Sequence, residues 1–282
     1  MLKFIALFFM TIDHIGHYLS GLLPTWIIIL CRCVGRLAFP IFAYSVALGY
    51  RRTRNFFRYG LRLLTWGFIA ELIMRYARNL INFRSHPNVL FTLCLGVVFL
   101  TAYELYCNAN LDRLVRMDPV QDTPGKIKLP HQYRFNLGFE MHHSLGIILG
   151  LVFMGLSLFA AYYFETDYGA YGVLTVFLFH LALKEERVED QYEKALLYLA
   201  LFNLIILSLS TVIHSYFRLN TKLFNYSGIQ GFAILSVLII FSSYMKEAEK
   251  GPRPPLWQKY FFYLYYPLHV LAICYIRLSM LR

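Results

Sequence analysis

Three ionisable side chains interrupt an apolar stretch near the N-terminus. The stretch, KFIALFFMTIDHIGHYLSGLL over residues 3–23, contains Asp13, His14 and His17. It is long enough to cross a bilayer, because about 20 helical residues at ~1.5 Å rise span ~30 Å of hydrocarbon. A charge at that depth costs at least ~2.5–3.5 kcal/mol, so such residues usually face a protein interior and mark a functional site. We predict that this helix carries the centre of an active site.

Helical spacing divides the polar residues of this stretch between two faces. Lys3 and His14 fall along one stripe, whereas Asp13 and His17 form an i,i+4 pair on the neighbouring stripe, close enough to share a proton or a hydrogen bond. A single intramembrane histidine can also serve only as a hydrogen-bond bridge between helices. Three ionisable groups in little more than one turn favour chemistry over that structural role.

The composition indicates an all-α, polytopic membrane bundle. The 282 residues are 58% hydrophobic and 15% charged, which is too apolar for a soluble domain, and the apolar runs are continuous, unlike the alternating strands of a β-barrel. The net charge of +11 comes from Lys and Arg between the runs, so no nucleic-acid partner is expected. The five cysteines support neither a disulfide framework nor a zinc site, and no metal is expected.

Nine apolar runs predict about nine transmembrane helices in a single domain over residues 1–282, with a polar loop at 108–144. The loops on the side of the N-terminus would hold 17 Lys and Arg residues against 7 on the other side, which favours a cytoplasmic N-terminus and an external C-terminus. No small-residue cleavage site follows the first run, so we expect it to be retained. The predicted spans are 3–23, 26–50, a third ending near 76, 88–106, 145–163, a sixth ending at 183, 195–214, 229–244 and 260–278.

The second span carries Arg36 at about 15 Å from its outer end by helix rise. An arginine at that depth needs a partner or an anionic ligand, and Asp13 is the obvious partner within the protein. Pro40 removes a backbone hydrogen bond four residues later, which should kink the helix and open room for a cavity.

Two other features have both a structural and a functional explanation. The segment RRTRNFFR after the second span contains Arg51, Arg52, Arg54 and Arg58. Such a cluster usually anchors a span on the cytoplasmic side, and it could also hold the phosphates of a cofactor. Asp167 precedes the sixth span, where it could cap the free N–H groups of the helix or act in the site.

Five blocks in order along the chain resemble the TraX family of conjugal-transfer membrane proteins: KFIALFFMTIDHIGH, GRLAFPIFAYSVALGY with the TR that follows, NVLFTLCLG, DYGAYGVLTV and YYPLHVL. The segment 108–144 is longer than the family usually carries. The resemblance implies a multi-pass protein of the bacterial cytoplasmic (inner) membrane that acetylates the N-terminus of a conjugative pilin. TraX proteins are also similar to wider transmembrane acyltransferases, including the acyltransferase-3 family, whose first helix carries a basic residue, ten intervening residues and a histidine. Lys3 and His14 have that spacing.

The resemblance implies acetyl-CoA as the co-substrate and transfer of its acetyl group across the membrane to pilin or a surface glycan, by a protein surrounded by membrane lipids. Acetyl transfer needs a base, and histidine suits this task because its ordinary pKa is about 6.5. We expect His14 to be the base, with Asp13 or Asp167 orienting it or steadying its imidazolium. The groups that could polarise the thioester carbonyl are Arg36, Tyr266 and His269. Basic residues on the side from which CoA arrives are predicted to bind its phosphates: Lys3, Arg51, Arg52, Arg54 and Arg58.

Two other function classes remain open. A proton-coupled transporter also places Asp and His at bilayer depth and breaks its helices with proline, although no convincing internal repeat is visible. A non-catalytic assembly factor of a conjugation or secretion apparatus is the third possibility. An enzyme should hydrolyse acetyl-CoA slowly without an acceptor, a transporter should leave it intact, and an assembly factor should tolerate loss of His14.

Overall fold

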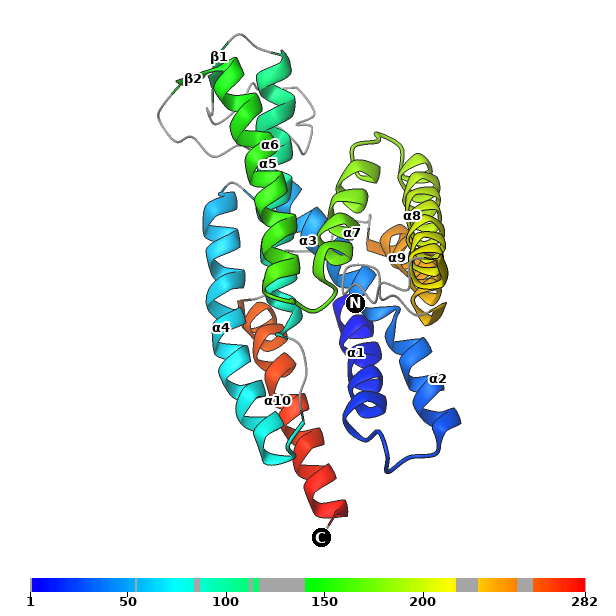
Figure 1. Cartoon of the computed structure of the whole chain (residues 1–282). Coiled ribbons are helices and arrows are strands. Elements are labelled where there is room, and N and C mark those ends of the chain that lie inside the picture. Colours follow the sequence, from blue (N-terminus) through cyan, green and yellow to red (C-terminus); the bar gives the residue numbers. More distant parts are fainter. Residues whose placement is uncertain are drawn as a thin grey trace. The chain divides into compact units, whose positions relative to one another are not determined.

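Helices make up most of the structure, a computed structural model that describes residues 2–53, 55–83, 87–111, 114–116, 140–216, 228–247 and 256–281 (Figure 1). The α-helices are α1 (Leu2–Tyr18), α2 (Thr25–Gly35), α3 (Ala38–Arg52), α4 (Phe56–Leu80), α5 (Val89–Leu111), α6 (His143–Tyr163), α7 (Gly169–Ala182), α8 (Val188–Tyr216), α9 (Ser236–Glu247) and α10 (Leu256–Met280). A 3₁₀ helix, η2, covers Gly228–Leu235. Strand β1 (Leu114–Arg116) pairs antiparallel with β2 (Glu140–His142). The predicted all-α membrane bundle is confirmed, with this short two-stranded pairing added inside the predicted polar loop.

Each predicted span corresponds to helical structure, but two spans are interrupted. The span 26–50 is divided into α2 and α3, and the span 229–244 into η2 and α9. Five segments are long and apolar enough to cross a membrane: Thr25–Arg52, Val89–Asn108, His143–Tyr163, Val188–Thr211 and Tyr260–Met280. Gly169–Ala182 and Ile229–Ser242 are shorter apolar helices.

The interruption between α2 and α3 has a direct cause in Pro40. Pro40 has no N–H to donate to the carbonyl of Arg36, and in a continuous helix its ring would clash with that carbonyl. The chain therefore turns at Arg36 and Leu37 before α3 begins at Ala38. The predicted kink is confirmed, and it falls just before the proline, at the end of α2 that carries Arg36.

The chain forms two compact units, each described by itself. Unit 1 consists of residues 1–44, 68–86 and 185–282, and unit 2 of residues 45–67 and 87–184.

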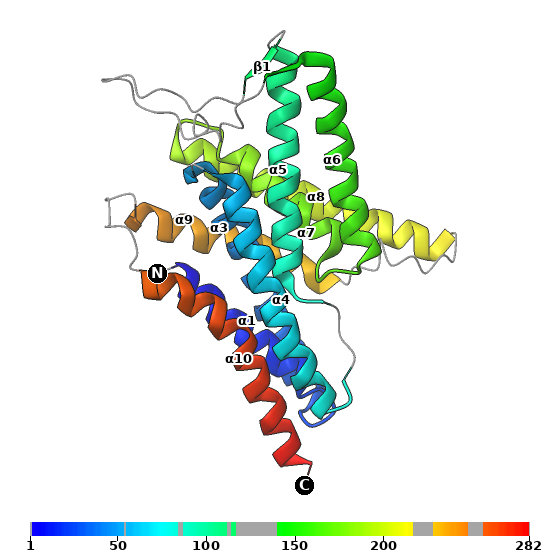
Figure 2. The same ribbon diagram turned by 90° about the vertical axis from the view of Figure 1, so that its left-hand side faces the viewer.

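In unit 1, α1 packs between α2 and α10. The contacts of α1 with α10 advance in the same direction along both helices, from Phe4 against Phe262 to His14 against His269. The two helices are therefore parallel, as Figure 2 shows. Parallel first and last spans are what an odd number of crossings requires.

In unit 2, α5 packs closely against α6 and α7. A Cβ atom at Gly150 of α6 would lie 2.9 Å from the carbonyl oxygen of Ala102, and one at Gly96 of α5 would lie 3.1 Å from Val176. Small residues at these crossings let the helix backbones approach, as is common between membrane helices.

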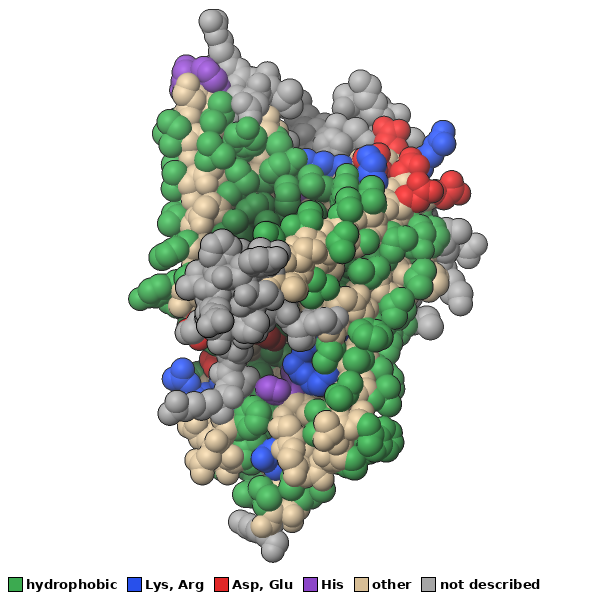
Figure 3. Space-filling model, turned by 45° about the vertical axis from the view of Figure 1, so that its right-hand side comes forward, with side chains coloured by type: hydrophobic (Ala, Val, Ile, Leu, Met, Phe, Trp, Pro, Cys, Tyr) green, Lys and Arg blue, Asp and Glu red, His purple; other side chains and the backbone are tan. Residues whose placement is uncertain are grey.

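Apolar side chains remain exposed along the outer faces of several helices. On α6 alone, Leu145, Ile148, Leu151, Leu156 and Phe159 are about half exposed. Figure 3 shows hydrophobic side chains over much of one face of the molecule. A soluble protein would bury such residues, whereas lipid tails solvate them, so the pattern agrees with a membrane protein.

Candidate active site

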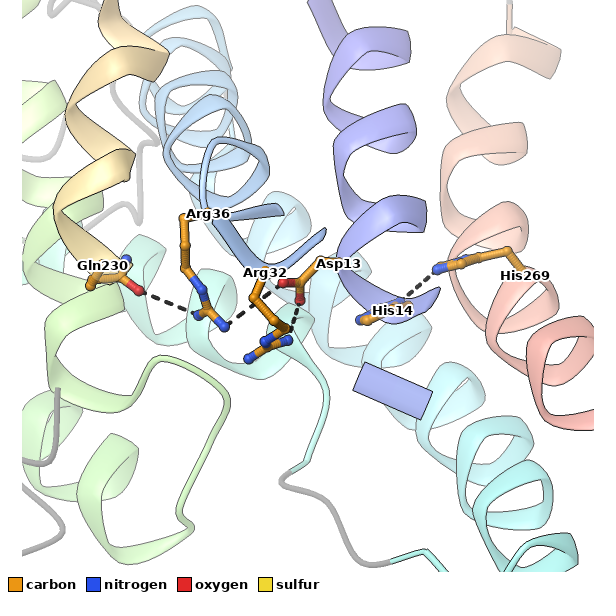
Figure 4. Close-up of polar contacts among 6 residues, drawn as sticks. All are labelled: Asp13, His14, Arg32, Arg36, Gln230 and His269. Carbon is orange, nitrogen blue, oxygen red and sulfur yellow. Dashed lines mark hydrogen bonds and ion pairs between the residues drawn. The ribbon is translucent and has the colours of Figure 1, made fainter. Parts of the chain in front are cut away.

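His14 of α1 and His269 of α10 meet in unit 1. Nδ1 of His14 lies 2.6 Å from Nε2 of His269, and the two rings are stacked at 4.9 Å with an interplanar angle of 10°. Figure 4 shows the pair joined across the gap between the two helices. The sequence predicted each of these histidines as a site residue, and the structure brings them together.

The hydrogen bonds around His269 determine which ring nitrogens carry protons. Nδ1 of His269 lies 2.9 Å from the backbone carbonyl oxygen of Tyr265. A carbonyl can only accept, so Nδ1 of His269 is the donor and, in the neutral ring, Nε2 has the lone pair. Nδ1 of His14 must then donate to His269, which leaves the lone pair of His14 on its Nε2. Within the described residues, His14 Nε2 has no hydrogen-bond partner.

A second group of charges lies beside this pair, on α1 and α2. Nη1 of Arg32 donates to Oδ2 of Asp13 at 2.8 Å, and Nη2 of Arg36 lies 3.8 Å from Oδ1 of Asp13. Arg36 also donates to Oε1 of Gln230 at 3.3 Å. In Figure 4 the second nitrogen of His14 points away from His269, toward the side on which these groups lie. The predicted partnership of Asp13 with Arg36 is confirmed, and Arg32 is an additional and closer partner.

Asp13 is therefore engaged with two guanidinium groups, which changes the role predicted for it. We expected it to orient His14 or to share a proton with His17, but the residue that orients His14 is His269. The ring of His17 packs edge to face against Phe83 at 5.0 Å. The reason is one of helix geometry, because adjacent positions point about 100° apart, and Asp13 faces α2 while His14 faces α10.

Tyr266 and Lys3 also belong to unit 1. Tyr266 is buried, with its ring 6.2 Å from that of His14 and 6.1 Å from that of His269. The ammonium of Lys3 lies 5.6 Å from the ring of Phe262, near the start of α1. Because α1 is continuous between them, Lys3 is about 16 Å from His14 along the helix axis, as the spacing predicted.

The other predicted site residues are in unit 2 or outside the described residues. Arg51 is buried, Arg52 and Arg58 are exposed, and Arg54 lies outside the described residues. The backbone N–H of Asp167 donates to the carbonyl of Pro87 at 3.1 Å, and its own carbonyl accepts from the hydroxyl of Thr92. The prediction that Asp167 caps α7 was wrong by one position: the N-cap is Tyr168, with φ of 63° and no side-chain capping bond.

Sequence reasoning missed a buried polar group in unit 2. Nε2 of His180 lies 2.8 Å from Oε1 of Glu104, and Nζ of Lys184 lies 3.1 Å from the same oxygen. His180 is only 1% exposed. The signal was present, because Glu104 and His180 interrupt apolar runs in the same way as Asp13 does. Among the residues that the structure describes, no three His, Cys, Asp or Glu side chains gather as metal ligands would.

Comparison with protein families decides the relationship. A model described as TraX protein matches residues 1–111 and 138–277. The chain belongs to the TraX family. This membership indicates a conjugation-related membrane protein, in agreement with the apolar helices. The TraX match omits residues 112–137, which lie inside the segment 108–144. Neither the curated proteins nor the solved structures that were searched give a match.

Proposed function

We propose that this TraX protein is an acetyl-CoA-dependent acetyltransferase of the bacterial inner membrane that transfers an acetyl group across the membrane to an amine or a hydroxyl of its acceptor. The observation that carries the proposal is the order of hydrogen bonds from the Tyr265 carbonyl through His269 to His14, which leaves a lone pair on His14 Nε2. A histidine held in one tautomer by a neighbouring acceptor is the arrangement that general-base catalysis requires. Pilin acetylation, which the family resemblance implies, is consistent with this chemistry.

In the proposed reaction, His14 Nε2 removes the proton of the acceptor as its nitrogen or oxygen attacks the thioester carbonyl. A new C–N or C–O bond forms, the C–S bond breaks, and the thiolate of CoA takes the proton back from the imidazolium. During this cycle His269 keeps accepting the hydrogen bond from His14 Nδ1, so it stabilises the ring while it is charged. No redox partner or metal is needed.

The arginine pair of α2 would stabilise the negative charge that develops on the carbonyl oxygen. Arg32 and Arg36 carry two positive charges against the single carboxylate of Asp13. A net positive charge preorganised on the side toward which His14 Nε2 points favours an oxyanion there. We assign Asp13 the role of holding these guanidinium groups in place, and Tyr266 is a second candidate donor.

The co-substrate and acceptor assignments are part of the same proposal. Acetyl-CoA would meet the basic segment 51–58 from the cytoplasm, with its phosphates paired to Arg51, Arg52, Arg54 and Arg58. Lys3 would favour the same anionic cofactor near the start of α1. A pilin amine and a surface-glycan hydroxyl both fit the base chemistry.

The test is acetyl-CoA turnover by purified protein, measured as free thiol release without and with a candidate acceptor peptide or glycan. His14→Ala should lower kcat by about 10²–10⁴-fold, because it removes the general base. His17→Ala on the same helix is the matched control and should cost much less. Both variants must first show normal expression and a monodisperse elution profile.

If acetyl-CoA stays intact while proteoliposomes carry a solute, the protein is a transporter. If His14→Ala supports conjugation normally, an assembly role is favoured.

A further inference from the structure

One helical turn beyond His14, two arginines converge on Tyr18 in unit 1. Nη1 of Arg277, on α10, donates to the carbonyl oxygens of Tyr18 and, at 3.1 Å, of Ser20. Arg78, on α4, donates to the hydroxyl of Tyr18 and, at 2.5 Å, to Oε1 of Glu71. The bond-making steps proposed above use neither arginine.

Both guanidinium groups have buried N–H groups left over. Arg78 is 6% exposed, and its Nη1 is buried with no hydrogen-bond partner among the residues that the structure describes. Nε of Arg277 is likewise buried and has no hydrogen-bond partner in the described part of the chain. A buried donor that remains unsatisfied costs about 1–3 kcal/mol, and more when it is charged. Two such groups beside one residue indicate that a polar ligand completes the site.

The charges around Tyr18 indicate what that ligand is. Glu71 pairs with Arg78, whereas within the described part of the chain Arg277 has no carboxylate partner, only the carbonyls and the ring of Phe83 at 5.8 Å. The carbonyls belong to the C-terminal end of α1, where a cation is favoured. That capping role explains Nη1 of Arg277, but it does not explain the buried Nε of Arg277 or Nη1 of Arg78. Among the described residues one positive charge therefore has no counter-charge. The matching ligand is a carboxylate or a phosphate, which a guanidinium binds through paired N–H groups.

We propose that Arg78 and Arg277 bind an anionic group of the acetyl acceptor, so that the substrate carries a carboxylate or a phosphate near its reacting amine or hydroxyl. This inference rests on the proposed function. The Tyr18 ring is 5.7 Å from the His14 ring, so an anion held beside Tyr18 lies about one helical turn, ~6 Å, from the base. It also lies on the opposite side of His14 from Lys3. The anion would therefore orient the acceptor from one side while acetyl-CoA arrives from the other.

The experiment measures anion binding without acetyl transfer. Purified protein in a maltoside detergent is titrated with inorganic phosphate, and separately with propionate, against chloride of equal ionic strength, while the midpoint of thermal unfolding is followed. Both anions should raise the wild-type midpoint. Arg277→Gln should weaken phosphate binding by about tenfold or more. Arg75→Gln, an exposed arginine one turn from Arg78 on α4, is the matched control and should bind phosphate like the wild type. Arg277→Lys keeps the charge without the paired N–H groups. This variant should fold, and its phosphate affinity should lie between those of Arg277→Gln and the wild type.

Two further arms separate the sources of the anion. Saturating CoA should leave the phosphate titration unchanged, and loss of the phosphate response in CoA would assign the site to the cofactor and overturn the proposal. Mass spectrometry of the purified protein should find no phospholipid whose retention depends on Arg277, and such a lipid would also overturn it. Equal phosphate binding by Arg277→Gln and wild type would overturn it as well. None of these readouts requires turnover, so the two proposals can fail separately. If the protein binds anions but never uses acetyl-CoA, the acetyltransferase proposal is refuted and the anion site remains.

Discussion

Gly35 of α2 lies directly against the carboxylate of Asp13 on α1, at a point where a Cβ atom on residue 35 would overlap the Asp13 side chain. Arg32 of α2 and Arg36, which directly follows α2, lie on either side of Gly35, so the close approach that this glycine permits also brings both guanidinium groups to the carboxylate. One helical turn further along α1, Gly16 makes a similar contact, since its Cβ atom would lie 2.7 Å from that of Cys31. The position of the charged group therefore depends on two small residues between the helices.

Gly35→Ala should lower the thermal unfolding midpoint and reduce acetyl transfer together. The added methyl must displace Asp13 or separate the helices, and overpacking of this kind costs about 1–3 kcal/mol. Gly155→Ala on α6 is the control, because outside its own stretch of helix no atom of the described residues lies within 4 Å of its Cβ position. That change should be neutral or stabilise by at most about 1 kcal/mol, through higher helix propensity. Equal stability of the two variants would show that α1 and α2 do not pack as described.

His269→Leu should reduce kcat by about one to two orders of magnitude, less than loss of His14 itself. Leucine cannot accept the hydrogen bond from His14 Nδ1, so the tautomer and the ring orientation are no longer fixed. His269→Gln is the matched variant, because its amide oxygen can still accept, and its kcat should lie between leucine and wild type. The KM for acetyl-CoA should change little in either variant. If leucine and glutamine were equally active, His269 would be only a packing residue.

Removing charge from the basic cluster should raise the KM for acetyl-CoA and leave kcat nearly unchanged, because these contacts would bind ground state and transition state alike. The exposed residues Arg52 and Arg58 are the ones to change, to glutamine, since burial of Arg51 makes its replacement a risk to folding. Desulfo-CoA binding to the same variants gives an independent measure. If the correctly inserted variant with both Arg52 and Arg58 changed kept the wild-type KM for acetyl-CoA, the cluster would serve only to anchor the span on the cytoplasmic side.

Most of the helices could be predicted from hydropathy, and the break before α3 could be predicted from Pro40. Both predictions succeed because they depend on residues that are close in the sequence. The partners across helices could not be predicted in the same way. His14 and His269 are 255 positions apart, and which face of α10 meets α1 is decided by packing. Arg32 is the clearer case: it lies in the same segment as Arg36, and only the rotation of α2 about its axis makes it the nearer partner of Asp13.

Glu104→Gln should destabilise the protein more than a typical substitution. It leaves Lys184 without its carboxylate and replaces the acceptor of the buried His180. Breaking a buried ion pair by removing one partner costs about 3–5 kcal/mol, which the midpoint of thermal unfolding in detergent would reveal. Glu185→Gln, which removes the partly exposed partner of Lys194, is the control and should lower the midpoint much less, because water screens such a surface ion pair. A similar midpoint for both variants would show that Glu104 is hydrated.

Cysteine labelling should show that residue 58 faces the cytoplasm and residue 165 the outside. The loop charges predict a cytoplasmic N-terminus, and the parallel packing of α1 and α10 places the two ends of the chain on opposite sides if both helices cross the bilayer. Arg58 and Glu165 are both exposed, so cysteines there can react. The background must lack the five native cysteines, of which Cys94 and Cys274 are buried and are best replaced by alanine.

In intact cells a membrane-impermeant maleimide should modify Glu165→Cys but not Arg58→Cys, and lysis should make the second site reactive. Labelling of residue 58 but not of residue 165 in intact cells would invert the protein and place the basic cluster outside, where it could not meet acetyl-CoA.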